Sequence, residues 1–273
     1  MSKNNTVRDI LTMTRRDALH ALRNPMLALS GLITPVIFLL LFVGVLGGSM
    51  SKALGAGASA VPYIVYITPG IILMAVGTSV SGTAINTTID RKEGIIARFR
   101  TMRIARTSVL TGAVIGSVLR TMCGVLVVLG LAGLLGFRTS AGAAQVAEAV
   151  GFIAMFLIAL TWLGVAFGLF ASSAAGANSL GLIPGFIPLV SSAFVPTDSM
   201  PAGVRWFAEN QPYTPIIETL RALLMGTPVG AQGLIAVGWS VVIGMAGYLW
   251  ARHLYNRDPS RQAGPSVAQL MGQ

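Results

Sequence analysis

Charged residues and cysteine are both scarce in this chain. Only 10% of its 273 residues are Asp, Glu, Lys or Arg, whereas soluble domains carry about 25%. The single cysteine, Cys123, excludes a disulfide framework and a cysteine-based metal site. His20 and His253 belong to no HExxH pattern, and no P-loop sequence for ATP binding occurs. We therefore predict no catalytic residue, no metal and no cofactor in the chain itself.

The chain is instead rich in long apolar runs. Hydrophobic residues make up 54% of the chain, and several uncharged runs reach the roughly 20 residues that a helix needs to cross a bilayer. We predict an all-α integral membrane protein with six transmembrane helices. Pro184 and Pro188 fall in the fifth, so we expect it to be bent or partly broken. The expected spans are residues 26–46, 63–85, 108–136, 150–170, 180–195 and 229–250.

The pattern of residues 1–25 is that of a basic amphipathic helix. Arginines occupy one side, and apolar residues recur at helical spacing on the other. Such a helix lies in the membrane interface, so we predict a cytoplasmic interfacial helix here. The alternative is a solvated helix packed on a soluble partner. The arginines are Arg8, Arg15, Arg16 and Arg23, and the apolar face includes Val7, Ile10, Leu11 and Leu22.

The net charge of +10 is concentrated between the apolar runs, a pattern typical of membrane topology and anionic lipid contact rather than of nucleic-acid binding. If there are six spans, the N-terminal segment, residues 90–106 and the tail 253–273 share one side. The positive-inside rule then places both termini in the cytoplasm. The excess of arginine over lysine is typical of a GC-rich bacterial genome, so we predict a bacterial cytoplasmic (inner) membrane protein.

The stretch from Phe194 to Gly226 is too polar for a span and too apolar for a loop. Its four prolines exclude one continuous helix, and Trp206 and Tyr213 favour the membrane–water interface. Because an odd number of spans would break the charge asymmetry, we predict that residues 197–226 form an extracellular re-entrant helical hairpin. Glu218 and Arg221, three residues apart, are expected to pair.

Two further features leave alternatives open. Arg120 lies inside the third span, where it either contacts an anionic substrate or lipid headgroup or extends to the interface. The loop 90–106 carries a small apolar face flanked by charge, which suits docking into a cytoplasmic partner but also suits a basic loop that only sets topology. Glycine pairs four residues apart fit close helix packing: Gly112/Gly116, Gly164/Gly168 and Gly181/Gly185.

The chain resembles the membrane subunits of ABC type-2 exporters, especially daunorubicin-resistance-like permeases. An amphipathic helix precedes six spans, and the loop after the second span runs from acidic and basic residues through Gly94, Arg98 and Phe99 to Arg106. Ala105 departs from the family, where many relatives have proline. The segment before the last span carries Phe194-Val195-Pro196, Met200-Pro201, Trp206, Pro212, Pro215, Leu220-Arg221 and Gly226.

The resemblance implies an exporter of amphiphilic drugs, lipids or glycolipids, energised by two ABC ATPase subunits that bind ATP and Mg. It also implies a second permease subunit, identical or not, and a surrounding membrane lipid phase. The residues implied in coupling to the ATPase are Asp90, Arg91, Glu93, Gly94, Ile95, Ile96, Phe99 and Arg100. Those implied along the substrate pathway or its exit are Arg120, Phe186, Trp206, Tyr213 and Glu218.

Two other functions compete with this prediction. One is an ion- or proton-coupled secondary transporter, although none of the nine acidic residues lies at the centre of an apolar run, where a proton-driven pump usually keeps one. The other is a non-transporting membrane scaffold or a subunit of a lipid-modifying enzyme. A P-loop ATPase in the adjacent reading frame would favour the exporter.

Overall fold

The computed structural model describes residues 25–48, 63–93 and 106–257, and every regular element in these ranges is a helix. The expected interfacial helix before Pro25, most of the loop 90–106 and the tail beyond Arg257 lie outside the described residues. The elements are α2 (Pro25–Leu41), the π-helix η1 (Phe42–Leu46), α4 (Tyr63–Lys92), α6 (Arg106–Leu134), α7 (Ala143–Phe170), α8 (Ala174–Phe186), the 3-10 helices η2 (Ile187–Val190) and η3 (Thr197–Ser199), α9 (Ala202–Asn210), α10 (Tyr213–Met225) and α11 (Gly230–Arg257).

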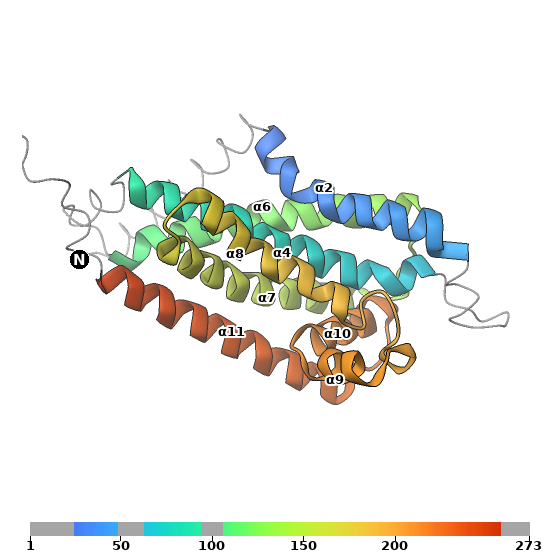
Figure 1. The fold of residues 1–273 in the computed structure, drawn as a ribbon. Helices are drawn as coiled ribbons and strands as arrows, with labels where there is room; N and C mark the ends of the chain where they lie inside the picture. Colours follow the sequence, from blue (N-terminus) through green and yellow to red (C-terminus); the bar gives the residue numbers. More distant parts are fainter. Residues whose placement is uncertain (1–24, 49–62, 94–105, 258–273) are drawn as a thin grey trace, which may run out of the picture.

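Helix α4 is the centre of the bundle. It contacts α2, α6, α7, α8 and α10, and 89% of its most apolar window is buried within the protein. The corresponding value for α11 is only 22%, because that helix packs on one side of the bundle against α7 and α10. Figure 1 shows the long helices side by side, with α9 and α10 together at one end of the bundle. Most of the apolar surface of α11 is therefore not covered by the described part of the chain.

Close helix packing around α4 depends on glycines of its neighbours. A Cβ atom added to Gly181 of α8 would overlap the backbone of Ser81, and one added to Gly185 would lie 2.5 Å from Cγ2 of Thr78. On another side of α4, Gly168 of α7 meets the backbone of Ala84. Small residues let membrane helices approach this closely, and the dispersion contacts so gained drive their association. The predicted packing role of the pairs Gly164/Gly168 and Gly181/Gly185 is confirmed.

Four described helices are long and apolar enough to cross a membrane, namely α4, α7, α11 and the part of α6 from Val114 onward. The helices α2 and η1 overlap the first expected span, and the shorter apolar segment Ala174–Val190 overlaps the fifth. The number of six spans stays a prediction. The fifth helix starts earlier than expected, because the Ser173 hydroxyl accepts a hydrogen bond from the Gly176 amide and caps α8 at Ala174.

The second helix also extends beyond the expected span. α4 continues from Tyr63 to Lys92, so Asp90, Arg91 and Lys92 form its last turn instead of opening a loop. The expected span ended at Ile85 because the final turns of α4 carry Asn86, two threonines and the charged residues, which break the apolar pattern. A helix accommodates such residues at a polar end. Arginine and lysine in a last turn also interact favourably with the C-terminal end of the helix dipole.

The contact between α4 and α8 provides a stability test. Gly181→Ala introduces a methyl group against the Ser81 backbone, and overpacking of this kind costs about 1–3 kcal/mol. We expect a lower midpoint in thermal unfolding of the purified protein in detergent. Gly82→Ala is the matched control, because no atom lies within 4 Å of a Cβ at that position. Equal midpoints for the two variants would contradict the close contact.

Candidate functional site

The fifth apolar segment breaks where the two prolines predicted. α8 ends at Phe186, a short 3-10 helix follows, and the chain then leaves helical geometry at Ser191. Pro188 has no N–H, so it cannot bond to the carbonyl of Pro184 one turn earlier. The phenol of Tyr213 on α10 donates a hydrogen bond to that Pro184 carbonyl at 2.7 Å. A side chain of α10 thus supplies a hydrogen bond in place of the lost backbone bond; α9 and α10 together are called the hairpin below.

After the break, the irregular segment 191–195 runs through the interior of the protein. Ser191, Ser192 and Ala193 are buried, and so is Phe194. The Ser192 carbonyl accepts a hydrogen bond from the Tyr66 hydroxyl at 3.0 Å, and the Phe194 carbonyl accepts one from the Tyr63 hydroxyl at 3.1 Å. Non-helical backbone at membrane depth is tolerated only when protein or water supplies such partners. Both phenols come from the first turn of α4.

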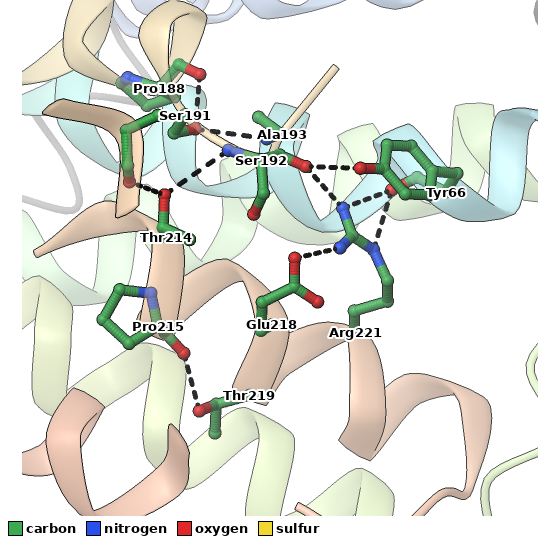
Figure 2. Close-up of polar contacts among 11 residues, drawn as sticks. Tyr66, Pro188, Ser191, Ser192, Ala193, Thr214, Pro215, Glu218, Thr219 and Arg221 are labelled. Atoms are coloured by element: carbon green, nitrogen blue, oxygen red, sulfur yellow. Dashed lines mark hydrogen bonds and ion pairs between the residues drawn. The ribbon is translucent and has the colours of Figure 1, made fainter. Parts of the chain in front are cut away.

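Arg221 on α10 connects three parts of this region. Its Nη2 atom donates to the Ser192 carbonyl at 2.8 Å and to the Tyr66 carbonyl at 3.2 Å. Its guanidinium carbon lies 3.9 Å from the centroid of the Tyr66 ring, a cation–π distance. Figure 2 shows the guanidinium between Glu218, the main chain of Tyr66 and the Ser192 carbonyl. One side chain therefore links α10, α4 and the irregular segment.

The predicted pair between Glu218 and Arg221 is confirmed, with Nη1 of Arg221 2.6 Å from Oε1 of Glu218. The two side chains differ in exposure: 10% for Arg221 and 36% for Glu218. The arginine is thus committed to contacts within the protein, whereas part of the carboxylate remains accessible. Because Arg221 gives its donors to two main-chain carbonyls and one carboxylate, we assign it a structural role in holding the break together.

Helices α9 and α10 form the two short helices that the proline spacing predicted, and α10 ends at Gly226 with a left-handed φ of 72°. On α9, Arg205 contacts Asp198 at 2.7 Å and Glu209 at 2.8 Å. The hydrogen bond and charge of Glu209, followed by the charge of Asp198, raise the pKa of Arg205. This ion-pair cluster is exposed, unlike the Arg221 pair, and marks the polar side of the hairpin.

An apolar groove of about 400 Å³ runs along the outer face of α8 and η2. Phe207 of α9 lies at this groove, and the amide of Gln211 fixes the neighbouring backbone by donating to the Val190 carbonyl at 2.5 Å. The break in α8 and the hairpin thus shape the groove together. Its lining residues are Ser179, Leu182, Ile183, Phe186, Ile187, Val190 and Phe207.

The predicted pathway residues take different positions. Phe186 lines the groove and is 43% exposed. Trp206 is 69% exposed on α9, whereas Tyr213 is 1% exposed and bonded to the break, which makes it a brace. Arg120 stands apart on α6, 14 residues after the helix begins at Arg106, about 21 Å along its axis. Phe186, Trp206, Tyr213 and Glu218 therefore gather at the hairpin end, and Arg120 does not join them.

The predicted coupling residues are described only in part. Asp90 and Arg91 lie in the last turn of α4 and Glu93 follows it, exposed. The guanidinium of Arg91 donates to the carbonyls of Leu169 and Ala171, where α7 ends. Arg91 thus contacts the protein's own helices, a contact that sequence reasoning missed. Outside the described residues lie Gly94, Ile95, Ile96, Phe99 and Arg100.

Comparison with known proteins identifies the family of the chain. The model of the ABC-2 type transporter family matches residues 8–225. The chain belongs to the ABC-2 type transporter family. This ABC-2 chain is 30% identical over 200 residues to the daunorubicin resistance ABC transporter permease protein DrrB1 of Streptomyces coeruleorubidus, covering 71% of the chain and 67% of that protein.

A more distant ABC-2 relative spans more of the chain. The probable doxorubicin resistance ABC transporter permease protein DrrC of Mycobacterium tuberculosis is 23% identical over 244 residues, 87% of this chain and 84% of that protein. The predicted resemblance to daunorubicin-resistance-like permeases is therefore confirmed. The match extends through the break in α8 and through α10, so this site belongs to the shared part of the ABC-2 permease.

Removal of the Arg221 side chain tests its role at the break. Arg221→Met leaves the carbonyls of Tyr66 and Ser192 without this donor, and hydrogen bonds to a charged group contribute about 1.5–3 kcal/mol. We expect a clear drop in thermal stability in detergent, with Arg221→Lys intermediate because it retains the charge but not the planar fork. Arg205→Met on the exposed cluster should change the midpoint little. An unchanged unfolding midpoint in Arg221→Met would contradict the role of Arg221 in holding the break.

Proposed function

We propose that this chain is the transmembrane subunit of an ATP-driven exporter that moves an amphiphilic drug, lipid or glycolipid out of the cytoplasm or inner leaflet. The observation that carries the proposal is the apolar groove beside the break in α8, within a membrane protein of the ABC-2 family. The relatives named as daunorubicin and doxorubicin resistance permeases support a drug or drug-like amphiphile as cargo. Antibiotic resistance is the corresponding physiological role.

The substrate class follows from the groove and its surroundings. Its lining is apolar apart from the hydroxyl of Ser179, and it is open along one side of α8. The hairpin beside it carries the indole of Trp206 and the exposed ion pairs of Arg205. An apolar surface next to such a polar rim suits a molecule with one apolar and one polar part. We propose Phe186 as a wall of the pathway, with Trp206 and Glu218 near its exit.

The energy source in this proposal is a pair of separate ABC ATPase subunits, because the chain has no P-loop. Residues 90–106 would contact the ATPase, with Glu93, Gly94, Ile95, Ile96, Phe99 and Arg100 as contact residues. A second permease subunit, identical or different, completes the transporter. Both termini and this loop then lie in the cytoplasm, the orientation that the positive-inside rule favours.

Reconstitution decides between this proposal and the secondary transporter. The chain is co-expressed with the separate P-loop ATPase that the proposal requires, purified as a complex and placed in liposomes with daunorubicin as the probe. We expect daunorubicin movement that requires ATP and persists when a protonophore collapses the proton gradient. Movement driven by a proton gradient without ATP would overturn the proposal. A complex that forms but moves no amphiphile, including extracted bacterial lipids, would leave the scaffold function in its place.

The loop between α4 and α6 provides a second test. Phe99→Ala removes the apolar contact and Glu93→Arg reverses a charge, so we expect both variants to insert normally but to lose daunorubicin-stimulated ATP hydrolysis. The readout is the ATPase rate of the purified complex with and without the drug. Arg138→Gln, at the hairpin end of the bundle, serves as the control. Normal stimulation in both loop variants would exclude the coupling role.

The groove itself is tested by a large-to-small substitution. Phe186→Ala should raise the apparent KM for daunorubicin several-fold and leave expression unchanged, because this side chain lines the groove and is half-exposed. The matched control is Leu234→Ala on α11. This side chain is 82% exposed, and only 22% of the most apolar part of α11 is buried. The proposed pathway wall is wrong if both variants transport with the same KM.

A further inference from the structure

Arg91 joins the C-terminal end of α4 to the turn between α7 and α8. It lies in the last turn of α4, and its guanidinium donates to the carbonyls of Leu169 and Ala171. These carbonyls belong to the last residues of α7 and to the turn that leads into α8 at Ala174. Carbonyls at a helix end have no partner within the helix and carry its negative dipole end, so a guanidinium fork is well suited to bind them.

Close backbone contact joins the middle of the α4–α8 pair. Gly77 of α4 lies against the backbone of Pro184, and Gly181 of α8 lies against that of Ser81. The Ser81 hydroxyl donates to the Asn178 side chain at 2.5 Å, which adds a polar bond between the two helices. Interfaces packed this closely do not slide by small amounts, because any shift brings backbone atoms into overlap.

The other end of the pair is held at the break. The first turn of α4 supplies the Tyr63 and Tyr66 hydroxyls to the segment that follows α8, and Arg221 binds this segment and the Tyr66 carbonyl together. Because Arg221 belongs to α10, the hairpin is fixed to the same end. Arg91 lies 25 positions after Tyr66 on the same helix, about 38 Å at the α-helical rise.

We propose that Arg91 and Arg221 are positioning residues that hold α4 to the α7–α8 turn at one end and to the segment after α8 at the other. This clamp fixes α4 and α8 as one rigid unit, which carries movement of the α4 C-terminus to the α9–α10 hairpin. The inference rests on the proposed function for the source of that movement, but the rigidity of the pair does not depend on it. A displacement of the α4 C-terminus moves the α7–α8 turn through Arg91. It then reaches the hairpin along two helices that cannot shift separately.

This assignment gives Arg91 a role different from a direct contact with an ATPase. A residue that only touched the partner would affect the assembly of the complex and leave the permease alone unchanged. The clamp, in contrast, affects the permease in the absence of any partner. The two roles therefore separate when the chain is measured by itself and in complex.

The first measurement uses the permease alone. Spin labels are attached through Lys92→Cys and Ser172→Cys, two exposed positions on either side of the Arg91 contact, in a Cys123→Ala background. Electron paramagnetic resonance in nanodiscs should give a narrow distance distribution, which Arg91→Gln broadens and Arg91→Lys partly restores. Arg252→Gln, an exposed arginine of α11, is the matched control and should leave the distribution narrow. An unchanged distribution in Arg91→Gln would overturn the clamp.

The second measurement uses the complex with its ATPase. Labels at Gly203→Cys on α9 and Leu234→Cys on α11 report movement of the hairpin when ATP and vanadate trap the closed ATPase. The unmodified complex should show a shift in the distance between these labels, and Arg91→Gln and Arg221→Met should each reduce it while ATPase assembly remains intact. A full shift in both variants would overturn the transmission. No shift in the unmodified complex would instead count against the proposed function, and the first measurement would still decide the clamp.

Discussion

A peptide group that leaves helical geometry inside a bilayer needs a partner from the protein, because hydrocarbon offers none. The same need applies to the region after α8, whose backbone is buried within the protein. The Pro184 carbonyl is bonded by Tyr213, the Ser192 carbonyl by Tyr66 and Arg221, and the Phe194 carbonyl by Tyr63. Each donor belongs to α4 or α10, so the break in one helix fixes the positions of two others. The hairpin is therefore part of the packed structure and not an appended loop.

The same constraint explains the central place of α4. Its first turn supplies phenols to the break, its middle admits α7 and α8 through their glycines, and its last turn supplies Arg91 to the end of α7. Hydrogen bonds between membrane helices are individually modest, and close packing of small residues adds dispersion contacts along the whole interface. The combination makes the inner helices a rigid unit, whereas most of the outer helix α11 is not covered by the described part of the chain.

Much of this arrangement was predictable from the sequence, because hydropathy and proline chemistry act locally. The uncharged runs predicted the long helices, Pro184 and Pro188 predicted the break, and the spacing of Glu218 and Arg221 predicted their ion pair. The partners of Arg91 and Tyr66 were not predictable, since each contact joins segments far apart in the chain and leaves no periodic pattern. Tyr213 was expected along the pathway or at its exit, but its hydrogen bond was not predictable, because it depends on a carbonyl that only the folded chain brings near.

The central claim is that side chains of α4 and α10 hold the break, residues 187–195, in place. Hydrogen exchange in lipid nanodiscs tests this claim most directly. The amides of Ser192 and Ala193 donate to the hydroxyls of Thr214 and Ser191 in the buried interior, so they should exchange as slowly as the middle of α4 and far more slowly than the exposed helix α9. Tyr213→Phe should accelerate exchange in the segment 187–195. Exchange of that segment at the rate of α9 in the unmodified protein would contradict the account.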